Sequence, residues 1–368
     1  MAEFIIETKK IGGNNPCFII AEAGVNHNGE LRLAKQLVMA AKFAGADAVK
    51  FQTFTAENLV TDKAQLANYQ KKSQGESNNQ LSMLKKLELS PDDFVELIKF
   101  AREQQIIFLT TPHTADVIDY LSPHVAAYKI SSSDFTNILL HNKLMATGKP
   151  LILSCGMTVS HEVDTIINRF NQAQYGQLAL LQCTSSYPCP NSEVNLNIID
   201  TFNQKFGDIT IGFSDHTTSS EAGVAAIAKG AKIIEKHFTL SQKQAGPDHQ
   251  ASLEPDDLAE YINSIRQTEK MLGSADKRLT QSEVRTAAVG RKSLVAAHDL
   301  PAGKVIVETD LEAKRPAGGL DPLELNKILN KQLKFSVAKD EQINFDMFDK
   351  LELTTYNYPL PPGKESHL

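Results

Sequence analysis

The chain has 368 residues, of which 42% are hydrophobic and 22% are charged, and this composition excludes a disordered or fibrous protein. Its 38 Lys and Arg residues against 44 Asp and Glu residues give a net charge of −6, which argues against nucleic-acid binding. No apolar run approaches the roughly 18–20 residues of a membrane span, and the first residues, MAEFIIETKK, do not resemble a secretory signal. The 4 cysteines lack a metal-finger spacing and are typical of reduced thiols, so we expect a cytoplasmic protein that binds no membrane.

Short apolar runs that end in polar or charged residues follow one another from residue 18 to residue 239. They span 18–24, 48–54, 106–112, 126–132, 150–156, 178–185, 209–216 and 233–239. Such runs are typical of parallel strands buried on both faces. Helical patterns lie between or after them at 31–45, 91–105, 161–172, 219–230 and 254–272. Eight strand–helix units predict an α/β fold, a (β/α)8 TIM barrel.

The segments outside this rhythm also carry predictions. Residues 4–12 are expected to form a hairpin that covers the bottom of the barrel, and the insertion 55–90 is expected to overhang its top. The pattern changes after residue 272, where short β-like runs between turn signals indicate a small β-rich domain. We therefore predict a catalytic barrel, a linker with some helix, a small C-terminal domain and a weakly ordered Pro-rich tail, over residues 1–272, 273–290, 291–350 and 351–368.

Polar residues gather at the predicted strand ends, where the active site of such a barrel lies. Lys50 and Lys129 stand within otherwise apolar strands, and a buried lysine is costly unless an anion pairs with it. One interpretation is a buried Lys–Glu pair, for which Glu22 is a candidate. The interpretation that we favour is a site for a phosphate and a carboxylate, because lysines supply charge and small hydroxyls fill the remaining acceptor positions. The hydroxyl candidates are Thr111, Ser132, Ser154 and Ser214.

Two histidines, His216 and His237, end neighbouring predicted strands. They are either polar histidines with ordinary partners or a pair of metal ligands, and the spacing leaves both interpretations open. Two imidazoles with an open coordination shell suit Mn, Fe, Co or Zn acting as a Lewis acid. Glu235 shares the strand face of His237, whereas Lys236 points the other way and is expected to be a surface or helix-facing lysine.

Several strings at these positions resemble the sialic acid synthase family. They are AEAGVNHNG (21–29), VKFQTF (49–54), YKISSSD (128–134), LSCGM (153–157), CTSSYP (183–188), GFSDHT (212–217), EKHFT (235–239), GPDHQASLEP (246–255) and KRPAGGLDP (314–322). The resemblance covers residues 16–345 and implies a (β/α)8 barrel followed by a small antifreeze-like (SAF) β domain. It also implies condensation of phosphoenolpyruvate with an N-acetylmannosamine-type sugar and water, which gives a nine-carbon sialic acid and phosphate.

The resemblance further implies individual roles. His216 and His237 would bind a divalent metal, usually Mn²⁺, with Mg²⁺ or Co²⁺ as alternatives. Glu22 would manage protons around the tetrahedral intermediate. Phosphoenolpyruvate would be held by Lys50, Thr111, Lys129, Ser132, Ser154 and Ser214, and the sugar hydroxyls by Gln52, Tyr187 and Asp248. Arg315 would reach from the small domain into a partner's barrel and hold the N-acetyl group, which implies a domain-swapped homodimer.

The sequence departs from the family pattern at three positions of the site rim. Ser185, also counted as a substrate-binding residue, replaces a frequent Asn, Asp134 a usual Glu and His113 a common Phe. These departures leave the sugar open, because related synthases use 2,4-diacetamido-2,4,6-trideoxyhexoses to make legionaminic or pseudaminic acid. GPDHQASLEP and KRPAGG favour the sialic or legionaminic side. Other classes are a metal-dependent aldolase or another phosphoenolpyruvate-condensing barrel, and a non-catalytic carbohydrate-binding protein.

Overall fold

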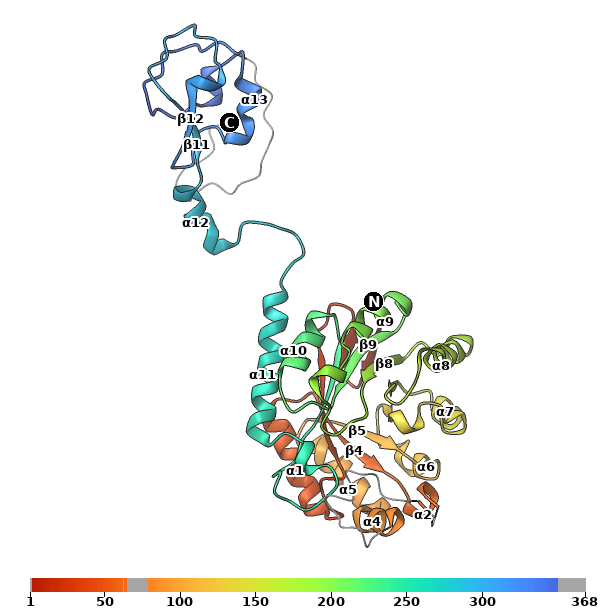
Figure 1. Ribbon diagram of the computed structural model, residues 1–368. Coiled ribbons are helices and arrows are strands. Elements are labelled where there is room, and N and C mark those ends of the chain that lie inside the picture. The colour runs from red at the N-terminus through yellow and green to blue at the C-terminus, as the bar shows by residue number, and fades with distance from the viewer. Residues whose placement is uncertain (1, 62, 65–78, 350–368) are drawn as a thin grey trace. The chain divides into compact units, whose positions relative to one another are not determined.

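Eight parallel strands close into a barrel in the order β10-β3-β4-β5-β6-β7-β8-β9 (Figure 1). The structure is a computed structural model that describes residues 2–61, 63–64 and 79–349, so the predictions for most of the polar stretch 70–80 and for the tail 351–368 lie outside the described residues. The strands are β3 (Phe18–Gly24), β4 (Ala48–Thr53), β5 (Ile107–Pro112), β6 (Tyr128–Ile130), β7 (Leu151–Ser154), β8 (Leu178–Cys183), β9 (Thr210–Asp215) and β10 (Ile233–His237). The predicted TIM barrel is confirmed.

The lower half of the barrel interior is apolar. Side chains that alternate along the strands, such as Ile20, Leu109 and Ile152, form one buried cluster. The antiparallel hairpin of β1 (Glu3–Ile6) and β2 (Lys9–Gly12) adds Phe4, Ile6 and Ile11 to this cluster. The predicted hairpin therefore covers the bottom, and the polar residues of the strands are left at the opposite, C-terminal end.

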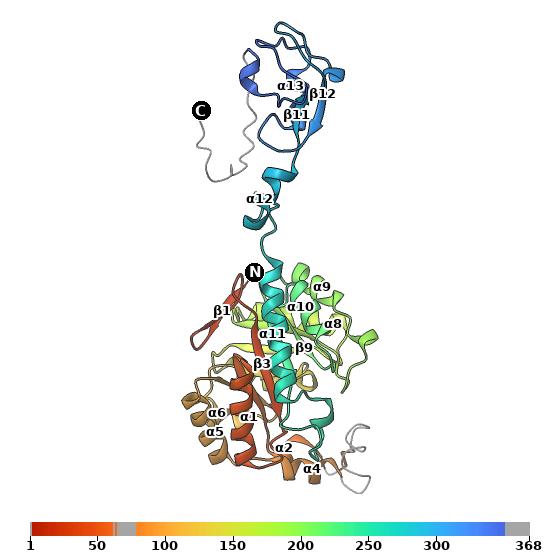
Figure 2. The same cartoon turned by 90° about the vertical axis from the view of Figure 1, so that its left-hand side faces the viewer.

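Helices surround the barrel on the outside (Figure 1). They are α1 (Leu31–Ala44), α5 (Pro91–Glu103), α6 (Val117–Leu121), α7 (Ile138–Met145), α8 (Ser160–Gln172), α9 (Asn197–Lys205), α10 (Glu221–Ala228) and α11 (Pro255–Leu272). Local sequence sets their ends: a capping box between Ser90 and Asp93 starts α5, and Gly45, with φ of 89°, ends α1. The last of them, α11, lies beside α1 and α10 (Figure 2).

The insertion after β4 contributes two short helices, α2 (Ala56–Leu59) and α4 (Gln80–Leu87). Met83 and Leu87 of α4 form a small apolar cluster with Val25 and Phe54, which follow β3 and β4 directly. This cluster holds α4 at the C-terminal end of the barrel, as predicted for the insertion.

The second compact unit begins at Ser274 and contains α12 (Gln281–Gly290), β11 (Ser293–Ala296), β12 (Leu311–Lys314) and α13 (Leu325–Ile328). It has a core of its own, which includes Leu294, Leu300 and Ile343. Of the predicted β-like runs in this unit, RKSLVAA forms β11, whereas Val305 and Val337 make only isolated bridges. In the run KVIVETD the Asp310 carboxylate accepts the backbone N–H of Val307, which turns the chain into a short 3₁₀ helix instead of a strand.

Two further sequence-based expectations concern the whole chain. Every helix in the described ranges is too short or too polar to cross a membrane. All 4 cysteines are free thiols and buried, as predicted.

Candidate active site

A cavity of about 480 Å³ opens at the C-terminal ends of the barrel strands. It is lined by all the predicted barrel residues except Asp248, namely Glu22, Lys50, Gln52, Thr111, Lys129, Ser132, Ser154, Ser185, Tyr187, Ser214, His216 and His237. It is also lined by residues outside that prediction: Glu235, Cys183, Ser131, Ser133, His113, Gln80 and Met157. Residues distant in sequence meet here because parallel strands end at one rim.

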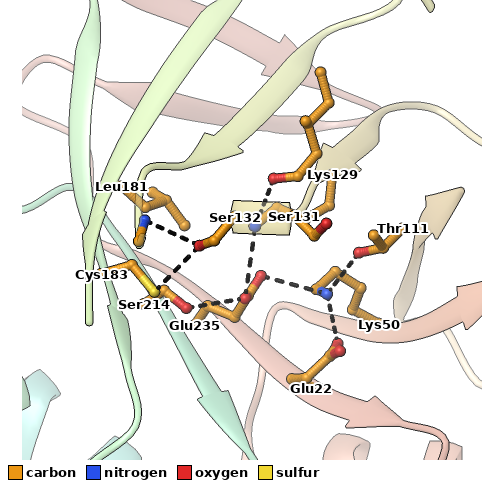
Figure 3. A network of polar contacts seen from close by, with 12 residues as sticks. Glu22, Lys50, Thr111, Lys129, Ser131, Ser132, Leu181, Cys183, Ser214 and Glu235 are labelled. Atoms are coloured by element: carbon orange, nitrogen blue, oxygen red, sulfur yellow. Dashed lines mark hydrogen bonds and ion pairs between the residues drawn. The ribbon is translucent and has the colours of Figure 1, made fainter. Parts of the chain in front are cut away.

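The floor of the cavity is a network of buried lysines and glutamates (Figure 3). Lys50 Nζ lies 2.7 Å from Glu22 Oε2 and 3.6 Å from Glu235 Oε2, and it donates a hydrogen bond of 2.9 Å to Thr111 Oγ1. Lys129 Nζ lies 3.8 Å from Glu235 Oε1 and donates to its neighbour's backbone, Ile130 O, at 3.0 Å. The Lys50–Glu22 pair that the sequence left open is therefore present, while Lys129 pairs with only one carboxylate of the described residues, at a longer distance.

These contacts separate the pKa values of the two glutamates. Burial raises the pKa of Glu22, although Lys50 opposes the shift. Burial would also raise the pKa of Glu235, but Lys129 and Lys50 outweigh it and lower that pKa to about 2. Burial lowers the pKa of Lys129. Glu235 is thus ionised at neutral pH, whereas Glu22 is the carboxylate better suited to exchange protons there.

Several hydroxyls around this floor are positioned for a ligand. Ser154 Oγ and Ser185 Oγ are buried and have no hydrogen-bond partner within the described part of the chain. Ser132 Oγ accepts the Gly156 N–H at 3.0 Å, and Ser214 Oγ donates to Glu235 Oε1 at 3.1 Å. Because buried polar groups in proteins are almost always paired, the free hydroxyls indicate where acceptor atoms of a ligand would bind.

His216 and His237 lie close together above this floor, with ring centroids 5.4 Å apart, and Tyr187 packs against both rings. His216 Nδ1 donates to Thr184 O at 2.7 Å, which leaves Nε2 as the nitrogen with a lone pair. His237 Nδ1 is buried and has no hydrogen-bond partner among the described residues. Burial, and then the neighbouring His216, lower the pKa of His237 well below its usual value, so its imidazole is neutral.

His237 Nδ1, which has no partner among the described residues, and the nearby His216 Nε2, which lies 3.5 Å from Ser214 Oγ, fit a metal ion with few protein ligands. Within the ranges that the structure describes, no group of three or more His, Cys, Asp or Glu side chains is arranged to hold a metal ion. A metal at His216 and His237 would therefore keep most of its coordination positions for water and substrate.

The residues next to these histidines face the helices instead of the cavity. Lys236 Nζ lies 3.0 Å from Asp215 Oδ2 and 5.0 Å from the centroid of the Tyr261 ring, and both charged groups are fully buried. Lys236 is thus the helix-facing lysine expected from strand alternation, and it is not a surface residue.

The two remaining predicted residues lie outside the cavity lining. Asp248 is half-buried beside Gly24, and burial, followed by the charge of Glu22, raises its pKa to about 6. Arg315 belongs to the second unit, where it is exposed directly after β12. A contact between Asp248 and the sugar, and any role for Arg315, stay predictions.

Sequence reasoning placed Glu235 on the face of His237 but gave it no role in the site. The signal was available, because Glu235 is two residues before His237 and so shares its face. It also missed that two of the rim departures contact each other: His113 Nδ1 lies 3.0 Å from Asp134 Oδ2. The sequence separates those two residues by a helix and a strand, so only the fold reveals this pair.

Comparison with known proteins agrees with this geometry. The NeuB family profile matches residues 37–277, and the SAF domain profile matches residues 291–349. The chain belongs to the NeuB family. This is the sialic acid synthase family that the motifs indicated, and the chain is an enzyme of that family.

Relatives cover nearly all of the chain. An N,N'-diacetyllegionaminic acid synthase of Campylobacter jejuni is 41% identical over 88% of this chain and 98% of its own length. The human N-acetylneuraminate-9-phosphate synthase is 35% identical over 92% of this chain and 94% of its own. The crystal structure of an N-acetylneuraminic acid synthetase from Leptospira borgpetersenii, in complex with citrate, aligns with a TM-score of 0.68 at 33% identity and covers 77% of this chain and 94% of that one.

Proposed function

We propose that the chain condenses phosphoenolpyruvate with N-acetylmannosamine, or a closely related 2-acetamido sugar, and water to give a nine-carbon sialic acid and phosphate. The observation that carries the proposal is the cavity floor: among the described residues, Lys129 has a single distant carboxylate, and the buried hydroxyl of Ser154 in the same cavity lining has no partner. A substrate with two anionic groups, a phosphate and a carboxylate, suits this site. Membership of the NeuB family favours this reaction over an aldolase or a non-catalytic carbohydrate-binding protein.

The reaction forms one carbon–carbon bond and breaks one carbon–oxygen bond. The electron pair of the C2–C3 double bond of phosphoenolpyruvate attacks the aldehyde carbon of the open-chain sugar, and the aldehyde oxygen takes up a proton. Water then adds to the cationic C2 and loses its proton to a carboxylate. The hydroxyl group that this water leaves on C2 then gives up its proton as phosphate departs from the same carbon. C2 thereby becomes the carbonyl carbon of the keto acid.

The two glutamates are suited to different parts of this sequence. Glu22 has the raised pKa, so it serves as the base that takes the proton from water at C2. Glu235 stays ionised and contacts both lysines and Ser214, so it positions the groups that hold the phosphate and carboxylate. Lys50 and Lys129, which are both buried, balance the substrate charge.

His216 and His237 are the residues that would hold a divalent metal, for which Mn²⁺ is our first choice and Mg²⁺ or Co²⁺ are alternatives. When bound there, the metal would act as a Lewis acid on the aldehyde oxygen. Chelation should abolish phosphate release and Mn²⁺ should restore it, whereas His237→Ala should lower kcat without unfolding the protein. Full activity in excess chelator would contradict the metal assignment.

A second sugar has a specific observation in its favour. The Campylobacter jejuni relative, at 41% identity, is a legionaminic acid synthase. We therefore test phosphate release from phosphoenolpyruvate with Mn²⁺ against N-acetylmannosamine and 2,4-diacetamido-2,4,6-trideoxy sugars of the legionaminic and pseudaminic series. The sugar with the highest kcat/KM identifies the product. Absence of release with every sugar would refute the proposed function.

We further propose that the units act as a catalytic barrel (1–272), a linker (273–290) and a SAF domain (291–350), in a domain-swapped cytoplasmic homodimer. Arg315 would then hold the N-acetyl group in a partner's barrel, because its planar guanidinium suits an amide oxygen better than a lysine does. Mixing inactive Arg315→Ala chains with inactive Glu22→Ala chains should restore activity, since each mixed dimer has one intact site. If heterodimers form and stay inactive, the swap is wrong.

A further inference from the structure

The mouth of the barrel contains two levels of polar side chains. The lower level belongs to the floor and includes Thr111, Lys129, Ser214 and Glu235. Each of these is followed two residues later by another polar residue that lines the cavity: His113, Ser131, His216 and His237, respectively. Residues two apart on a strand point to the same side about 6.5 Å apart, so the second set forms an upper level.

The upper level has two opposite sides. In the closed barrel of eight strands, β10 lies four places from β6, and β9 lies four places from β5. His216 and His237 extend β9 and β10, whereas His113 and Ser131 extend β5 and β6. The His216–His237 pair and the His113–Ser131 pair therefore face each other across the mouth.

Asp134 holds the His113 side of the mouth in place. His113 Nδ1 donates to Asp134 Oδ2 at 3.0 Å, and the same oxygen accepts Ser131 Oγ at 2.9 Å. The other carboxylate oxygen accepts Asn137 Nδ2 at 3.1 Å, and the buried His141 donates from Nε2 to the Asp134 carbonyl at 3.0 Å. This network fixes the His113 ring and leaves Nε2 as its nitrogen for contact with a ligand.

We propose that His113, oriented by Asp134, binds the end of the sugar chain that is distal to the aldehyde and thereby selects among acetamido sugars. The inference rests on the proposed function, in which the aldehyde lies at His216 and His237. The remaining carbons then extend across the mouth toward His113. With its Nδ1–H given to Asp134, the ring has Nε2 left for a hydrogen bond with a hydroxyl or amide group of the sugar. The Asp134 carboxylate behind the ring disfavours a phosphate at this end.

The test compares wild type with His113→Phe, which keeps the ring and removes both nitrogens. The probes are N-acetylmannosamine, its 4-deoxy, 6-deoxy and 6-phospho forms, and 2,4-diacetamido-2,4,6-trideoxymannose. Loss of one neutral hydrogen bond should raise the KM of the preferred sugar about three- to tenfold, with the KM of phosphoenolpyruvate and kcat nearly unchanged. In wild type the kcat/KM of the preferred sugar should exceed that of one of its deoxy analogues. In His113→Phe the ratio of these two kcat/KM values should fall to about one. The matched control is His161→Phe, at an exposed histidine of α8.

A second variant covers the case in which His113→Phe does not fold. His113→Gln can donate to Asp134 and accept from the sugar, so its sugar KM should lie between those of wild type and the Phe variant. Unchanged sugar KM and analogue ratios in an active His113 variant would overturn this inference alone. A wild-type preference for the 6-phospho sugar would also overturn it, whereas no release with any sugar would overturn the proposed function itself.

Discussion

Lys129→Met should weaken phosphoenolpyruvate binding more than any other change in the cavity floor that leaves the protein folded. Lys50 Nζ has carboxylate oxygens at 2.7 and 3.6 Å, so its charge is largely neutralised within the protein. Lys129 Nζ pairs with one carboxylate oxygen of the described residues, Glu235 Oε1 at 3.8 Å, so more of its charge is available to a ligand. A charge-assisted hydrogen bond contributes about 1.5–3 kcal/mol, so we expect the KM of phosphoenolpyruvate to rise about ten- to 150-fold.

The free energy of unfolding should fall more in Lys50→Met than in Lys129→Met, although Lys129→Met has the larger effect on phosphoenolpyruvate binding. Lys50→Met leaves Glu22 and Glu235 without their shared cation, and a broken buried pair costs about 3–5 kcal/mol, whereas Lys129→Met leaves Glu235 with Lys50. Phosphate release at varied phosphoenolpyruvate concentration and denaturant unfolding measure the two effects. The matched control is Lys236→Met, which breaks the buried pair with Asp215 on the helix-facing side and should lower stability without changing the KM of phosphoenolpyruvate.

The pH profile gives an independent check on Lys129. Because its pKa lies below 10.5, its charge is lost as the pH rises, and the KM of phosphoenolpyruvate should rise on the alkaline side of wild type. The unfolded state binds more protons between the two pKa values, so the free energy of unfolding should increase with pH in that window. Both trends should be missing in Lys129→Met. If Lys129→Met keeps the wild-type KM and kcat, Lys129 is only a structural partner of Glu235 and the argument from available charge is wrong.

Glu235→Gln should lower kcat more than tenfold, because the two lysines and Ser214 lose a shared negative charge, while the KM of phosphoenolpyruvate should not rise, since Lys129 loses its neighbouring carboxylate and Lys50 keeps Glu22 alone; a raised KM at unchanged kcat would count against this role. Gly156→Ala should lower thermal stability and raise both substrate KM values, because an added Cβ would lie 2.8 Å from Ser132 Oγ and closer still to Ser185 Oγ; wild-type kinetics would show that the hydroxyls move freely. Asp248 has a pKa raised from 3.8 to about 6, so the sugar KM should fall as the pH rises through about 6, where the carboxylate ionises. The folded state binds more protons in that window, so stability should fall with rising pH, and Asp248→Asn should abolish both trends; a sugar KM that is flat across this range would contradict the assignment.

Much of the fold could be read from local sequence because each unit repeats one pattern. A run such as PLILSCG is continuously apolar up to Ser154, which is typical of a strand covered on both faces, and its polar end marks the rim. Side-chain alternation then predicted that Glu235 shares a face with His237 and that Lys236 points away from it. The small domain was less predictable, since Asp310 redirected an apolar run that β propensity alone favoured.

The sequence by itself determined which residues stand at the barrel mouth, because strand period and apolar patterning are local properties. Only the tertiary structure decided which of them contact each other. Closure of the barrel brings Glu235 of β10 between Lys50 of β4 and Lys129 of β6, and it brings His113 onto Asp134. Those contacts shift the pKa values of Glu22, Glu235 and Lys129, since pKa values depend on burial and on neighbours across the barrel, which no local pattern contains.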